Sequence, residues 1–94
     1  MASIVSVTPA AINGGINCCK VSIQKLESAA RQLQQNYQRA GAGGWSDSKY
    51  RDLGSIVSEC NDALTKPVTQ LTECIGKLQR LLEAVNEYES SGLR

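Results

Sequence analysis

The sequence predicts an all-α protein: an antiparallel hairpin of two long helices that pairs with a partner into a four-helix bundle. Apolar residues repeat every seven positions in each half of the chain, and a glycine-rich segment separates the halves. The composition also favours helix, because Leu, Ile, Val and Ala supply most of the 41% hydrophobic residues and Phe is absent. With 94 residues, the chain is expected to form one domain, 1–94.

The first helix is expected over about residues 9–40. Thr8 can cap its start, and Pro9 is tolerated at the first helical position. A glycine inside a helix costs about 1 kcal/mol relative to alanine. The segment Asn13-Gly14-Gly15 therefore predicts a helix that is firm only from about Ile16 onward. Two apolar rows follow this helix: Val5, Ile12, Cys19, Leu26 and Leu33, and beside them Ile16, Ile23, Ala30 and Tyr37.

A turn is expected at residues 41–46, and the second helix over about 47–90. The letters "GAGG" at 41–44 predict the left-handed backbone of a helix end and a tight turn. Ser46 or Asp47 can cap the second helix. Pro67 removes one backbone donor, so it should kink the second helix or divide it in two. The unchanged heptad phase on both sides favours a kink.

The second helix carries three apolar rows. The first two are expected to form the seam, and the third to widen the apolar face beyond what one helix covers. The first row is Val57, Leu64, Leu71, Leu78 and Val85; the second is Cys60, Pro67, Cys74, Leu81 and Tyr88; the third is Val68, Ile75 and Leu82.

This wide face predicts a partner, because an isolated pair of helices of this size would be marginally stable. Ile16, Ile23 and Leu26 are expected to hold the hairpin together. The alternative is a monomer whose N-terminal arm folds over the third row. The predicted partner surface consists of Leu64, Val68, Leu71, Ile75, Leu78 and Leu82.

Charge and hydropathy argue against nucleic acid and membrane binding. Ten basic and nine acidic residues give a net charge of +1, and they form no run of five like charges. No apolar run approaches the ~20 residues of a membrane span. The N-terminal "MASIVSVTPAAINGG" lacks the basic and apolar regions of a secretory signal. We therefore expect a cytosolic protein, or one exported by a route that needs no such signal.

Four cysteines raise the question of a metal site or a disulfide. The chain has no histidine and no C-x-x-C pair, so neither zinc nor another cofactor is expected. If Tyr37 lies near Leu53, a small register shift brings Cys18 or Cys19 within bonding reach of Cys74.

We take Cys19–Cys74 as the candidate disulfide. The alternative is that all four cysteines stay reduced, as in the cytosol. Cys60 is expected to face Ala30 as a small core residue. Without histidine no base stands beside a thiol, and the carboxylates are spaced as exposed helix residues, so we expect no enzyme.

The turn "GGWSDSKY" between two helices resembles the WXG superfamily of small helical-hairpin proteins, which travel through or assemble with type VII (ESX-like) secretion systems of Gram-positive bacteria and mycobacteria. The resemblance covers nearly the whole chain, including the opening "IVSVTPAAI". It implies that Trp45 packs over the helix junction and that hairpins pair into four-helix bundles. The motif is Gly44, Trp45, Ser46 and Asp47.

Two features depart from the family pattern. Asp47 stands where the third motif position has glycine, so this is a W-x-D version. Tyr88 is followed four residues later by Gly92, where exported members carry Asp or Glu. The chain thus lacks the usual export tag.

The resemblance, together with these departures, predicts a binding module of type VII secretion. It would be a targeting or chaperone partner, or a co-secreted subunit, of a larger helical substrate such as an LXG toxin. The expected partner is another helical hairpin or the N-terminal helical domain of that toxin, with a homodimer as a further option. The expected location is the bacterial cytoplasm, with export by type VII secretion as an open option. The alternative function is a homodimeric structural coiled coil with no export role.

Overall fold

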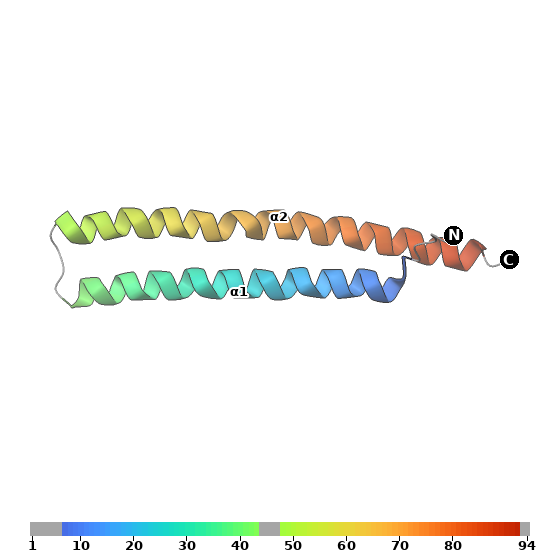
Figure 1. The fold of residues 1–94 in the computed structure, drawn as a ribbon, viewed down its shortest axis with the longest axis horizontal. Helices are drawn as coiled ribbons and strands as arrows, with labels where there is room; N and C mark the ends of the chain where they lie inside the picture. Colours follow the sequence, from blue (N-terminus) through green and yellow to red (C-terminus); the bar gives the residue numbers. More distant parts are fainter. Residues whose placement is uncertain (1–6, 44–47, 93–94) are drawn as a thin grey trace, which may run out of the picture.

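The computed structural model describes residues 7–43 and 48–92, and these residues form a helical hairpin. Helix α1 is Pro9–Ala42 and helix α2 is Ser48–Gly92. The two helices run antiparallel and side by side along their length (Figure 1). The part of the chain that the structure describes contains no strand. The prediction of an all-α hairpin is therefore confirmed.

Helix α1 begins as the sequence predicts. Thr8 is the N-cap, and its Oγ1 accepts a hydrogen bond of 3.1 Å from the Ala11 N–H. Pro9 occupies the first helical position. The helix is continuous through Gly14 and Gly15, and the expectation that it is firm only from about Ile16 stays a prediction. Gly15 faces Leu78 of α2, and a Cβ added at Gly15 would lie 3.5 Å from Leu78 Cδ1, an ordinary van der Waals contact.

The end of α1 differs from the expected turn. The helix extends to Ala42, and the Gly43 N–H donates to the carbonyls of Arg39 and Ala40. Gly43 has φ −79°, so this cap does not use the predicted left-handed backbone. The motif residues Gly44, Trp45, Ser46 and Asp47 lie outside the described residues, and their roles stay predictions.

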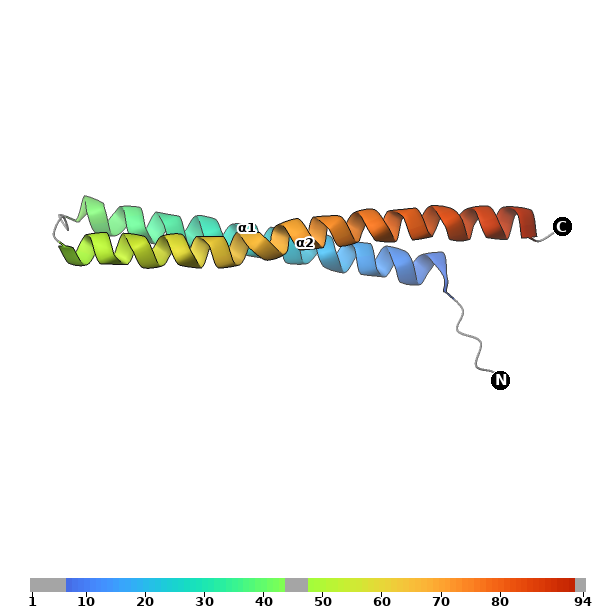
Figure 2. The same ribbon diagram turned by 90° about the horizontal axis from the view of Figure 1, so that it is seen from above.

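Helix α2 runs unbroken through Pro67 (Figure 1). Of the two outcomes expected for this proline, division of the helix is therefore wrong, and the kink stays a prediction. The 45 residues of α2 exceed the 34 of α1. At about 1.5 Å per residue α2 is about 16 Å longer, and its last turns extend beyond the start of α1 (Figure 2).

Few side chains are fully buried in this fold. Among the described apolar residues only Ile12, Ile16 and Val57 are less than a tenth exposed. The radius of gyration is 21.2 Å, whereas a compact domain of this length has about 12 Å. The hairpin is therefore a rod, 72 × 22 × 16 Å, whose core is one line of residues between two helices.

The seam of α2 differs from the expected one. Beside the Val57 row, the buried and half-buried positions belong to a second row at heptad spacing: Gly54, Asn61, Val68, Ile75 and Leu82. The Cys60 row, predicted to lie in the seam, is exposed at every position except the half-buried Pro67. Cys60 itself is exposed, so the prediction that it is a core residue is wrong. The row of Val68, Ile75 and Leu82, which was expected to widen the apolar face, instead packs on α1.

Candidate docking interface

Two tyrosines join the helices near the turn. The rings of Tyr37 and Tyr50 are stacked, with centroids 4.5 Å apart and an angle of 5° between their planes. The Tyr50 hydroxyl donates a hydrogen bond of 3.2 Å to the Tyr37 carbonyl. Because stacked aromatic pairs need a defined geometry, this contact fixes the position of one helix along the other.

Each tyrosine lies against a glycine of the opposite helix. A methyl group at Gly54 would lie 2.6 Å from the Tyr37 hydroxyl oxygen, and one at Gly41 would collide with the Tyr50 hydroxyl. We call these four residues the Tyr–Gly clamp. Its sequence signal is a glycine four residues after each tyrosine, which places ring and glycine on one helix face. The contact between each tyrosine and the opposite glycine was not among the features predicted from the sequence.

The clamp should make stability depend on pH. Partial burial raises the pKa of Tyr50 above its usual 10.0, and the neighbouring Tyr37 adds to the shift. The neutral hydroxyl therefore stabilises the hairpin fully below pH 10, and this contribution is lost as pH rises through the raised pKa. Tyr50→Phe should lower stability at pH 7, because the hydrogen bond to the Tyr37 carbonyl is lost. It should also lose less stability than the parent as pH rises above 10.

Urea unfolding followed by circular dichroism at several pH values measures this effect. Tyr88→Phe is the control, because Tyr88 is 76% exposed near the end of α2. Equal losses in the two variants at pH 7 would contradict the assigned role of the Tyr50 hydroxyl.

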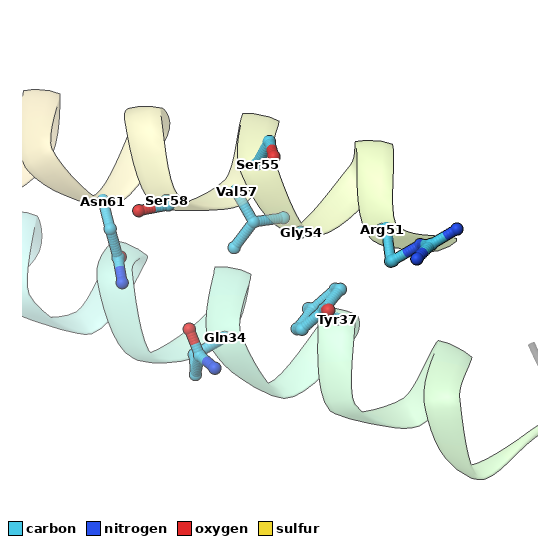
Figure 3. A pocket seen from close by; sticks show the side chains of 8 residues that line it. All are labelled: Gln34, Tyr37, Arg51, Gly54, Ser55, Val57, Ser58 and Asn61. Carbon is cyan, nitrogen blue, oxygen red and sulfur yellow. The ribbon is translucent and has the colours of Figure 1, made fainter. Parts of the chain in front are cut away.

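An open depression on one side of the hairpin, at the clamp, is lined in part by polar side chains (Figure 3). Gln34 of α1 and Arg51 and Ser58 of α2 contribute polar side chains to it. The Asn61 side chain reaches toward α1 here, and its Oδ1 is buried without a hydrogen-bond partner. We call this side the polar flank.

The opposite flank of α2 is apolar and exposed. Heptad spacing aligns its members on one line next to the Val57 row, on the side away from Ser58. Leu53 is 40%, Leu81 44% and Tyr88 76% exposed, and Ile56, at 56%, lies one turn from Leu53. We call this line the flank row: Leu53, Cys60, Pro67, Cys74, Leu81 and Tyr88.

The six residues predicted as the partner surface lie elsewhere. All are half-buried in the seam, and Leu78 is close to Gly15 of α1. Helix α1 covers part of each side chain, and a partner could contact only the part that stays exposed. Their role in partner binding stays a prediction. The residues are Leu64, Val68, Leu71, Ile75, Leu78 and Leu82.

All four cysteines are free thiols in this structure. Tyr37 opposes Gly54 and Gly15 opposes Leu78, so counting along the helices places Cys19 close to the level of Cys74. Cys19 is half-buried and Cys74 is exposed. The Cys19–Cys74 disulfide stays a prediction.

No group of three or more metal-ligating side chains occurs among the described residues. Neither α1 nor α2, within the described ranges, is apolar enough over a sufficient length to cross a membrane. Comparisons with known proteins gave no match to a family model, a curated protein or a solved structure.

Proposed function

We propose that this hairpin is a protein-binding module that docks a helical partner on its flank row. The main support is the exposed apolar line of Leu53, Leu81 and Tyr88, which lies on the side of α2 opposite the polar flank. Exposed contiguous apolar surface bordered by polar residues is typical of protein interaction sites. A second hairpin laid on this flank would complete a four-helix bundle.

We further propose that the module serves type VII secretion as a targeting or chaperone partner, or a co-secreted subunit, of a larger helical substrate such as an LXG toxin. The turn letters "GGWSDSKY" and the long helix on each side of them support this role. The alternative is a homodimeric coiled coil without an export role. The exposed flank row is compatible with both.

Two double variants that each add two carboxylates to α2 test the docking flank. Leu53→Glu/Leu81→Glu places two carboxylates on the flank row, and we expect it to lose at least 90% of the partner captured from the native host. Ser58→Glu/Gln79→Glu adds the same charge to the same helix on the polar flank and should retain capture. Mass spectrometry of the captured chains and of the culture medium then tests the secretion role.

A captured chain with a helical N-terminal domain, present in the medium together with the hairpin, would support the adaptor function. Equal capture by both variants would contradict the docking flank. Capture of only this chain itself, with no export, would favour the structural coiled coil.

A further inference from the structure

The hairpin exposes more surface than a compact protein of the same mass. Its accessible surface is 7003 Å², whereas a compact 10.1 kDa protein exposes about 5,300 Å². A stable dimer buries about 800 Å² per partner. The difference of about 1,700 Å² is therefore ample for an interface of ordinary size. Four of the six large apolar side chains exposed among the described residues, Leu53, Ile56, Leu81 and Tyr88, lie on or beside the flank row.

The central part of the flank row is symmetric about Pro67. Seven residues on either side of Pro67 stand Cys60 and Cys74, and fourteen residues on either side stand Leu53 and Leu81. A twofold-symmetric interface uses the same patch on both copies, so each residue meets its symmetric counterpart. An antiparallel α2–α2 contact with the axis at Pro67 would pair each Leu53 with Leu81 of the other copy. It would likewise pair each Cys60 with Cys74.

Helix α1 is compatible with the same axis. The register of Tyr37 with Gly54 and of Gly15 with Leu78 puts Pro67 level with residues 24–26 of α1. The α1 row on the side away from Gln34 begins with three small residues, and residues 24–26 lie between the second and the third. Because side-chain size sets the distance between packed helices, such a row permits close approach of a second α1. The row is Gly15, Ser22, Ala29 and Asn36.

We propose that a second copy of this chain docks on the flank row, antiparallel, with the twofold axis at Pro67 and with Cys60 of each copy opposite Cys74 of the other. The inference rests on the proposed docking flank and names its occupant and register. It also gives the exposed cysteines a role: under oxidising conditions two symmetric disulfides lock the dimer.

The locking chemistry is thiol–disulfide exchange with a small disulfide such as oxidised glutathione. The Cys60 thiolate attacks the glutathione disulfide, forms a mixed disulfide and releases one glutathione thiolate. The Cys74 thiolate of the other copy then attacks the protein sulfur of the mixed disulfide and releases the second glutathione. Each protein disulfide thus forms from two thiols as one glutathione disulfide is reduced to two glutathione thiols.

A complementation experiment tests the register. In a Cys18→Ala/Cys19→Ala background, which also removes the intrachain route to Cys74, two further variants carry Cys60→Ala or Cys74→Ala. Each is incubated with oxidised glutathione, alone and in an equimolar mixture, and analysed by non-reducing electrophoresis and peptide mapping. We expect at least tenfold more covalent dimer in the mixture than in either variant alone, joined Cys60 to Cys74.

Two results would overturn the proposal, and they affect the proposed function differently. A non-covalent dimer by light scattering, without the excess of covalent dimer in the mixture, overturns the register and leaves the docking flank intact. A monomer at 100 µM, with helicity preserved by circular dichroism, overturns the second copy as occupant. Capture of a different partner that the Leu53→Glu/Leu81→Glu variant loses would then show that the docking flank itself survives.

Discussion

Replacing Ile16 with alanine should lower the free energy of unfolding by about 3 kcal/mol, within the range for large-to-small core substitutions. Ile16 is 7% exposed and is one of only three buried apolar residues among those described. Native proteins have a total free energy of unfolding of about 5–15 kcal/mol, so this loss is a large fraction of it. The urea concentration at which half of the protein unfolds should therefore fall clearly below that of the parent.

Val21→Ala is the matched control, because Val21 lies on the same helix and is 38% exposed. It should cost less than 1 kcal/mol. Both variants are measured by urea unfolding at one fixed protein concentration, because self-association would stabilise the folded state by an amount that grows with the logarithm of concentration. Equal losses in the two variants would mean that the seam is not the main source of stability.

The sequence is sufficient to predict the hairpin because its signals are local. Thr8 and Pro9 predict the start of α1 correctly, since capping depends on adjacent residues only. The expected level of Tyr37 opposite Leu53 is one residue from the observed contact with Gly54. Heptad spacing within each helix and the glycine-rich turn carry this information.

The choice of the seam row on α2 depends on packing, and the sequence misleads there. The row that packs on α1 contains Gly54 and Asn61, which carry no apolar side chain, whereas the exposed row contains Leu53, Cys60 and Pro67. A hydrophobicity pattern therefore favours the exposed row. Gly54 belongs in the seam because the Tyr37 ring needs its space, which a composition-based pattern does not register.

The partner surface predicted from the sequence also depends on packing. Leu71 and Leu78 are half-buried because they pack on α1. Their heptad spacing would be the same whether they packed on a helix of the same chain or on a helix of another protein. The symmetry of the flank row about Pro67, in contrast, is readable in the sequence once the exposed row is known.

Replacing Gly54 with valine should destabilise the hairpin by about 2–3 kcal/mol. Helix propensity alone predicts a small gain, because valine is a better helix former than glycine. The added Cβ, however, would lie 2.6 Å from the Tyr37 hydroxyl oxygen, and the Tyr37 ring is held by its stack on Tyr50. Overpacking of this kind typically costs 1–3 kcal/mol. The size of the loss therefore reports how tightly the Tyr37 ring packs against position 54.

Gly76→Val separates the two effects. Gly76 lies on the same helix, and the nearest side-chain atom to a Cβ there is the mobile Arg80 Nη1 at 3.7 Å. This control should leave stability unchanged or slightly raised. A double variant, Tyr37→Ala/Gly54→Val, should lose less than the sum of its single changes, because removing the ring also removes the clash. Strict additivity in the urea-unfolding energies would show that Tyr37 and Gly54 do not contact each other, and the register of the whole hairpin would then have to be fixed by the Ile12–Ile16–Val57 core instead.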